Sequence, residues 1–182
     1  MKTIELDTEY LSNLSSLIAK IKFSGGMHTI KAVVAGGAIR DMLFNKPVSD
    51  IDVFYEGELK NNKLEEYFKD IKTNTASYPD GFNVTHNFTC SFFPVPIQLI
   101  KVKDIDKHIN TFPCPASRVW FDYKGIHGLD MNLMEDFKVK HFFWDQKVDL
   151  SYFLKIKSKY SDWEHEFEQK QFNPELEMEM EF

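Results

Sequence analysis

The stretch AVVAGGAIRD at residues 32–41, followed by DIDVF at residues 50–54, decides the fold of this chain. The valine-rich run that opens the first stretch predicts a buried strand. The Gly36-Gly37 pair that ends this strand lets the backbone turn sharply and approach a ligand closely, a geometry that suits a phosphate group. Residues 37–44 are expected to form a short helix whose N-terminus faces the same phosphate.

The second stretch alternates carboxylate and apolar side chains. In a strand, a period of two puts Asp50 and Asp52 on one face, while Ile51 and Val53 point into the core. Two adjacent carboxylates are typical ligands of Mg²⁺, and a pair of such ions clamps the attacking and leaving oxygens of a phosphoryl displacement. Asp50 has an alternative reading as a turn residue. Asp52 is harder to dismiss, because a carboxylate inside an apolar strand is costly unless a metal or an arginine pairs with it.

Together the motifs resemble the signature of the nucleotidyltransferase superfamily. In order, the chain carries a predicted strand, Gly36-Gly37, two spacers, Arg40-Asp41 and then Asp50-x-Asp52. The branch it resembles contains the catalytic head of class II CCA-adding enzymes and bacterial poly(A) polymerases, as a small, phage-type member. The resemblance covers residues 32–54. It implies an α+β protein of the nucleotidyltransferase (polymerase beta-like) fold, a small mixed sheet flanked by helices.

This resemblance also implies a site and a reaction. An NTP is held by Gly36, Gly37 and Arg40, and Asp50 and Asp52 are the catalytic residues that hold two Mg²⁺ ions during nucleotidyl transfer. The acceptor that it implies is an RNA 3′ end, tRNA in particular, with a protein hydroxyl as another option. For Arg40, an exposed ion pair with the next residue is the alternative.

One departure from the pattern concerns the metal ligands. Residues 96–102 are predicted to form a strand, where the family often places a third carboxylate, and Gln98 stands there instead. Because an amide oxygen is a poorer metal ligand than a carboxylate, either Asp50 and Asp52 work alone or activity is reduced.

A second departure lies at residues 112–122, which resemble a diverged second nucleotide-contacting motif of the family. Pro113 stands near the position of the family's Asp, and Ser117 near that of its Asn. Arg118 is expected to contact a phosphate of the nucleotide.

Composition bounds the size and the partners of the protein. With 182 residues and 43% apolar side chains, the chain supports one substantial core. We expect a nucleotidyltransferase-like domain over residues 1–150 and a helical C-terminal extension with an acidic tail over residues 151–182. The long helical regions that select the base and grip the RNA in larger enzymes have little room here, so specificity is expected to be reduced or supplied by a protein partner. A formal net charge of −6 argues against non-specific coating of nucleic acid.

Cysteine usage and hydropathy bear on location. Cys90 and Cys114 cannot build a disulfide framework or a four-ligand zinc site, and we expect buried thiols. The N-terminus has no signal-peptide pattern, and no segment approaches the roughly 20 apolar residues of a membrane span. We expect a cytoplasmic protein without membrane contact, in the host cytoplasm if the source is a virus.

The remaining elements follow from periodicity. The patterns predict helices at residues 10–23, 59–71 and 152–167 and strands within residues 82–93. Lys155, Lys157 and Lys159 are interpreted as a solvated helix face rather than an RNA grip. The alternating acidic tail at 175–181 is expected to be disordered.

Two hypotheses of function remain open. The first is a Mg²⁺-dependent nucleotidyltransferase. The second is a catalytically weak or inactive protein of this fold that acts as a binding or inhibitory module on a macromolecular partner. Gln98 and Pro113 favour the second, and the Asp50-x-Asp52 pair favours the first, because a scaffold has no reason to hold two adjacent carboxylates that repel each other.

Overall fold

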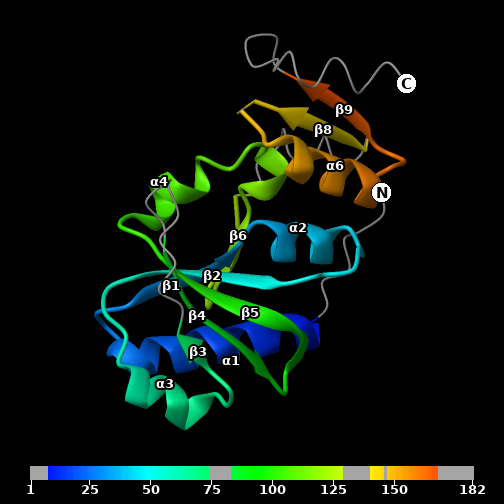
Figure 1. The fold of residues 1–182 in the computed structure, drawn as a ribbon. Helices are drawn as coiled ribbons and strands as arrows, with labels where there is room; N and C mark the ends of the chain where they lie inside the picture. The colour runs from blue at the N-terminus through cyan, green and yellow to red at the C-terminus, as the bar shows by residue number, and fades with distance from the viewer. Residues whose placement is uncertain (1–7, 74–82, 129–139, 146, 168–182) are drawn as a thin grey trace.

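A seven-stranded mixed sheet forms the centre of the molecule in a computed structural model, which describes residues 8–73, 83–128, 140–145 and 147–167. Its strand order is β3-β4-β5-β2-β1-β6-β7. Strands β2 and β5 pair in parallel, and the other neighbouring strands pair antiparallel. Helices lie on both sides of this sheet (Figure 1), so the predicted α+β fold, a mixed sheet flanked by helices, is confirmed.

Up to residue 101, the described part of the chain contains three helices and five strands of the sheet. In chain order they are α1 (Thr8–Gly25), β1 (Lys31–Ala35), α2 (Gly37–Leu43), β2 (Ile51–Glu56), α3 (Asn61–Tyr67), β3 (Lys72–Thr73), β4 (Asn83–Cys90) and β5 (Phe93–Lys101).

The later elements complete the sheet and add a small unit beside it. They are α4 (Ile105–Ile109), a 3₁₀ turn at Pro115–Ser117, β6 (Trp120–Asp122), β7 (Gly125–His127), β8 (His141–Trp144), α6 (Leu150–Lys159) and β9 (Glu164–Phe167).

One face of the sheet packs against α1. Apolar residues recur on this helix at the spacing of one helical face, and Leu14, Leu17 and Ile21 are fully buried. They join the alternate residues Ile51 and Val53 of β2 in the main core cluster. The predicted alternation of β2 is therefore confirmed on its apolar side.

The opposite face of the central strands has a different character. Val33 and Phe54 belong to a second apolar cluster that includes Ile105 and Ile109 of α4. Asp52 shares this face of β2 with Phe54, because side chains two residues apart in a strand point the same way. The face that carries the carboxylates is therefore partly apolar and partly open.

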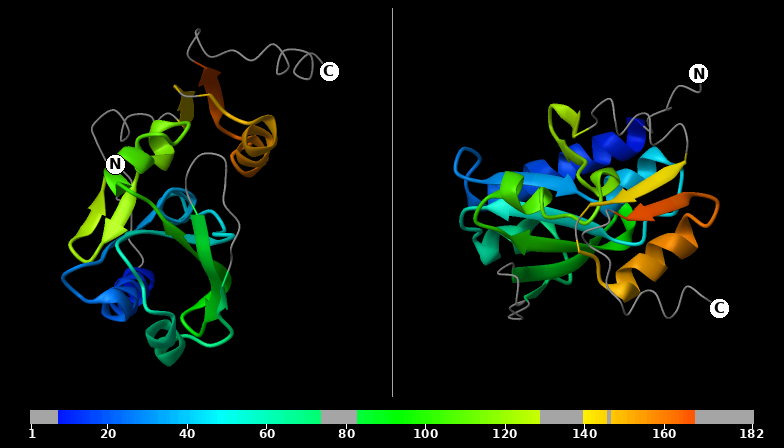
Figure 2. Two further views of the ribbon diagram at one scale, coloured as in Figure 1. Left: turned by 60° about the vertical axis from the view of Figure 1, so that its left-hand side comes forward. Right: turned by 90° about the horizontal axis from the view of Figure 1, so that it is seen from above.

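The C-terminal part of the described chain forms a compact unit on the side of the sheet opposite α1. Strands β8 and β9 pair in parallel, and α6 packs against them through Phe153 and Ile156. Figure 2 shows β8 and β9 side by side in two further views. Aromatic rings dominate this unit, and Trp144 lies within 5.4 Å of the ring of Phe153.

Several predicted boundaries change. The helix predicted at residues 152–167 is wrong in its second half, because α6 ends at Lys159 and residues 164–167 form β9. Strand alternation in Glu164–Phe167, with its odd-even burial, explains the difference. The helix predicted at 59–71 is shorter and spans Asn61–Tyr67. The acidic tail at 175–181 lies outside the described residues. Within the described residues, no helix is long and apolar enough to cross a membrane.

Candidate functional site

Asp50 and Asp52 sit at the start of β2. Ile51 lies between the two carboxylates in sequence and Val53 follows them, and both side chains are fully buried. Asp50 and Asp52 are partly buried. The Ser49 hydroxyl donates to Asp50 Oδ1 at 3.2 Å. Among the described residues, we find no donor that forms a hydrogen bond with the Asp52 carboxylate.

The parallel register between β2 and β5 places Gln98 directly opposite Asp52. Gln98 thus occupies the position on the neighbouring strand where the resemblance expects a third carboxylate. Its amide can add one neutral oxygen ligand beside the Asp pair but no charge.

Burial and charge both act on Asp52. The pKa of its carboxyl is raised to about 7, chiefly because burial disfavours the charged form and then because of the negative charge of Asp50, while the positive charge of Lys155 partly opposes the rise. A carboxylate with a raised pKa and an adjacent like charge is held in a destabilised ionised state. Any nearby positive charge would offset both costs.

The glycine turn lies at the N-terminus of α2. Gly36 has a φ of 76°, a backbone conformation that residues with a side chain rarely adopt. Its amide donates a hydrogen bond to the carbonyl of Val119 at 2.9 Å. A Cβ there would lie 3.2 Å from the Phe112 ring. At Gly37, the one atom of the described residues that a Cβ would meet is Arg40 Nη2, at 3.6 Å. Gly36 is thus required by the backbone, and Gly37 leaves open space.

A cleft of about 480 Å³ joins the glycine turn to Asp52. Three segments form its walls. The first is the β1–α2 turn with the face of β2, the second is the diverged motif around Phe112, and the third is the segment leading into α6. The lining residues are Ala35, Gly36, Gly37, Asp52, Phe54, Phe112, Pro113, Ser117, Lys147, Val148, Asp149 and Tyr152.

Arg40 does not form the exposed pair that was the alternative reading. Its side chain is 2% exposed and its Nη2 lies 2.8 Å from Asp41 Oδ1. Nη1 donates to Ser117 Oγ at 2.9 Å, and Nε donates to Asp41 Oδ1 at 2.9 Å. Tyr152 and Tyr160 hydroxyls lie at 3.4 and 3.3 Å from its nitrogens. The nucleotide-binding role of Arg40 stays a prediction.

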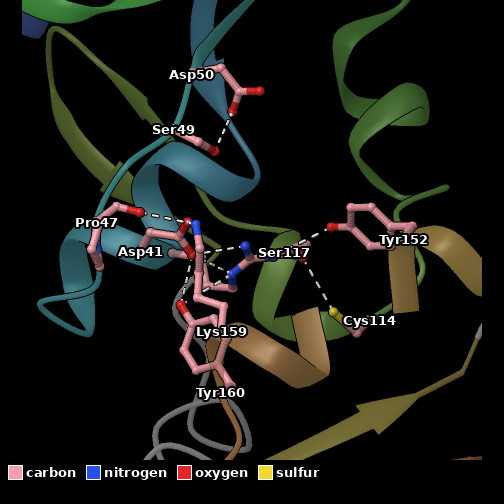
Figure 3. A network of polar contacts seen from close by, with 10 residues as sticks. Asp41, Pro47, Ser49, Asp50, Cys114, Ser117, Tyr152, Lys159 and Tyr160 are labelled. Atoms are coloured by element: carbon pink, nitrogen blue, oxygen red, sulfur yellow. Dashed lines mark hydrogen bonds and ion pairs between the residues drawn. The ribbon is translucent and has the colours of Figure 1, made fainter. Parts of the chain in front are cut away.

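Asp41 ties α2 to α6 (Figure 3). It accepts from the Tyr160 hydroxyl at 2.7 Å and from Lys159 Nζ at 2.5 Å. Lys159 also donates to the Pro47 carbonyl at 3.0 Å. Burial raises the pKa of the Tyr160 hydroxyl well above its ordinary value, so this group stays protonated and donates. The buried network fixes α6 over the cleft.

Arg118 is also engaged within the protein. Its Nη1 and Nη2 make a two-pronged contact with the Asp145 carboxylate at 2.6 and 2.5 Å, and Nε and Nη2 donate to the Phe112 carbonyl. This contact holds Phe112 over Gly36. Ser117, which stands near the position of the family's Asn in the diverged motif, is buried and its hydroxyl accepts a hydrogen bond from Arg40. The phosphate contact of Arg118 stays a prediction.

Lys147, Asp149 and Tyr152 line the cleft, and the sequence assigned them no role. Asp149 caps α6 by accepting from the Tyr152 amide at 3.2 Å, so an Asp before a helix was the available signal. Of the three lysines interpreted as a solvated face, Lys155 and Lys157 are exposed, and Lys159 instead contacts Asp41.

Within the described residues there is no group of three or more His, Cys, Asp or Glu side chains that could hold a metal ion. Cys90 and Cys114 are free thiols, and Cys114 is fully buried, as expected, whereas Cys90 is half-buried.

A family model described as Gabija anti-defense 2 family protein matches residues 9–140 of the chain. A search of curated proteins finds no match.

Solved structures with the same fold are tRNA-processing enzymes. The CCA-adding enzyme of Thermotoga maritima complexed with tRNA has a TM-score of 0.61 and 15% identity, over 92% of this chain and 42% of that one. A CCA-adding enzyme in complex with CTP has a TM-score of 0.58 and 11% identity, over 88% and 43%. A tRNA-processing enzyme in an apo form has a TM-score of 0.50 and 18% identity, over 79% and 38%. The chain thus spans about two fifths of these relatives' length, and at such identities the likeness establishes the fold.

Proposed function

The chain belongs to the Gabija anti-defense 2 family, and we propose that it is a Mg²⁺-dependent nucleotidyltransferase, which transfers a nucleoside monophosphate from an NTP to a hydroxyl acceptor. One observation carries the proposal. The carboxylates of Asp50 and Asp52 start the strand next to a glycine turn, and Asp52 and this turn line one cleft. A cleft of about 480 Å³ is within the size range of small-molecule sites.

The residues present fit a divalent cation. Asp52 is a partly buried carboxylate with a raised pKa, no donor among the described residues and a like charge beside it. Asp50, Asp52 and the amide oxygen of Gln98 would hold the metal, as hard oxygen ligands on two paired strands. When bound, Mg²⁺ polarises the α-phosphate and neutralises charge that develops on the transferring oxygens.

The chain's own residues bind and orient the nucleotide. Gly36 and Gly37 have no side chain of their own to keep phosphate oxygens from the backbone, and the Phe112 ring lies beside Gly36. Phe112 and Phe54 offer apolar surface to the base or sugar in the same cleft. In the transfer, the acceptor oxygen bonds to the α-phosphorus, the bond to the bridging oxygen of the β-phosphate breaks, pyrophosphate leaves, and the acceptor's proton passes to water.

For the acceptor we propose an RNA 3′ end, tRNA in particular. Support comes from the solved relative that is complexed with tRNA. The net charge of −6 makes a broad electrostatic grip on RNA weak, so we expect contacts confined to the cleft or supplied by a protein partner. A protein hydroxyl is the second acceptor class.

A second candidate function is a binding or inhibitory module without turnover. It is favoured by Gln98 opposite Asp52, where a carboxylate is expected, and by a family name that describes anti-defense rather than a reaction. Under this reading the fold serves to occupy a macromolecule of the defense system.

The experiment that separates the two uses the family's own phenotype. Cells that carry the Gabija defense express the wild-type protein, Asp52→Asn or Asp50→Asn, and are then challenged with phage. If transfer carries the function, both variants lose anti-defense activity at equal protein levels, and labelled NTP is incorporated into RNA only by wild type. Full anti-defense activity of both variants would favour the binding module and contradict the enzyme.

A further inference from the structure

The cleft needs positive charge that neither predicted arginine supplies in this conformation. A triphosphate carries several negative charges, and Asp50 and Asp52 add two more that the metal ions must balance. Arg40 is 2% exposed and surrounded by Asp41 and hydroxyl groups. Arg118 is held by the Asp145 carboxylate. Cations that reach the cleft must therefore come from another segment.

The segment that leads into α6 brings lysines to this place. Lys147 is exposed and lines the cleft together with Gly36, Gly37 and Asp52. An ammonium group on a flexible stem is a common binder of phosphate oxygens.

One face of α6 points toward the cleft and α2. Tyr152 lines the cleft, and Lys159 contacts Asp41 of α2. Lys155 lies three residues after Tyr152 and four residues before Lys159, so the three side chains share one helix face. The contacts of its two neighbours on this face orient Lys155 toward the carboxylates of β2.

The surroundings of the lysines on α6 distinguish them. Lys155 is exposed, and its ammonium is accessible to a ligand. Lys157 on the same helix lies instead over the Phe153 ring, 5.6 Å from its centroid.

We propose that Lys147 and Lys155 bind the β- and γ-phosphates of the NTP, so that the C-terminal unit is one wall of the nucleotide site. This inference rests on the proposed function and deepens it. The two lysines bind the phosphates that the resemblance assigned to arginine, and the contact between Asp41 and Lys159 holds α6, and with it Lys155, against α2.

The test compares affinities for nucleotides of different phosphate number. Wild type, Lys147→Ala, Lys155→Ala and the control Lys157→Ala are titrated calorimetrically with Mg²⁺ and α,β-methylene analogues of the four NTPs, and with the corresponding NMPs. Lys157→Ala removes the same charge from the same helix but from a side chain that lies over Phe153. Melting curves establish that all variants are folded.

We expect each of the two cleft substitutions to weaken triphosphate binding about tenfold, equivalent to about 1.4 kcal/mol, with NMP affinity unchanged. The control should stay within about twofold of wild type, since an exposed charge away from the ligand is largely screened. Equal triphosphate affinity of Lys147→Ala, Lys155→Ala and the control overturns the inference alone. If Arg118→Ala, titrated in the same way, loses tenfold in triphosphate affinity while the two lysine variants do not, the inference is also overturned and the phosphates are assigned to Arg118. Failure of wild type to bind any NTP analogue overturns this inference and the proposed nucleotide site together.

Discussion

The raised pKa of Asp52 makes the stability of the protein depend on pH in a way that one substitution removes. The folded-state pKa is about 7, above the value of about 3.9 in an unfolded chain. Between these values the folded state binds more protons than the unfolded state, so the contribution of Asp52 to stability is fully present below about pH 4 and is lost as the pH rises to about 7.

The expected change in the free energy of unfolding depends on how much of the pKa shift of Asp52 lies within the pH range that is measured. The range from pH 5 to pH 8 covers about two units of the pKa shift, and each unit corresponds to 1.36 kcal/mol. The free energy of unfolding of wild type should therefore fall by about 3 kcal/mol relative to that of Asp52→Asn. Urea denaturation of both proteins at pH 5 and pH 8 measures this double difference. Burial lowers the pKa values of His86, His108 and His165, which gives the opposite trend with pH, but these groups are the same in both proteins and cancel.

Two further measurements sharpen this test. Asp50→Asn removes the second cause of the shift but not burial, so its pH dependence should lie between those of wild type and Asp52→Asn. At pH 8, Mg²⁺ at ten times its dissociation constant should stabilise wild type by about 1.4 kcal/mol and leave Asp52→Asn unchanged. A double difference below about 1 kcal/mol, well short of the roughly 3 kcal/mol derived above, would refute the reasoning that the ionised Asp52 carboxylate is destabilised in the folded protein.

Other predictions concern the turn, the neighbouring strand and the buried network. Gly37→Ala should keep or raise the melting temperature, because among the described residues its Cβ meets only Arg40 Nη2, at 3.6 Å. It should nevertheless weaken NTP binding in calorimetry, and an unchanged affinity would show that the phosphates do not bind at this turn. Gln98→Glu should lower stability without Mg²⁺, regain it with Mg²⁺, and raise NTP incorporation if a third carboxylate helps catalysis; no Mg²⁺ response and no incorporation in either protein would count against the enzyme. Arg40→Met should lower the free energy of unfolding measured in urea by about 3–5 kcal/mol, because it leaves the Asp41 carboxylate buried beside fewer partners. Arg40→Met combined with Asp41→Leu should lower it by less, and equal losses would show that the pair is not coupled.

Local sequence was sufficient for the strand–turn–strand at the heart of the molecule. The apolar run of β1, the glycine pair and the alternation in β2 act within a few residues of each other, so backbone stereochemistry and a period of two determine them. The positive φ lies at Gly36 rather than at Gly37, yet the turn itself is where the pattern indicates.

The sequence by itself thus determined the strand, the glycine turn and the burial of Ile51 and Val53, because these follow from short-range spacing. Only the tertiary structure decided that Gln98 stands opposite Asp52, since strand register depends on long-range pairing. It alone revealed that Arg40 is buried and that Asp41 reaches Tyr160 and Lys159, partners 119 and 118 residues away. A window along the chain holds no information about such contacts, because burial, and with it charge and pKa, is a property of what the rest of the chain packs against each side chain.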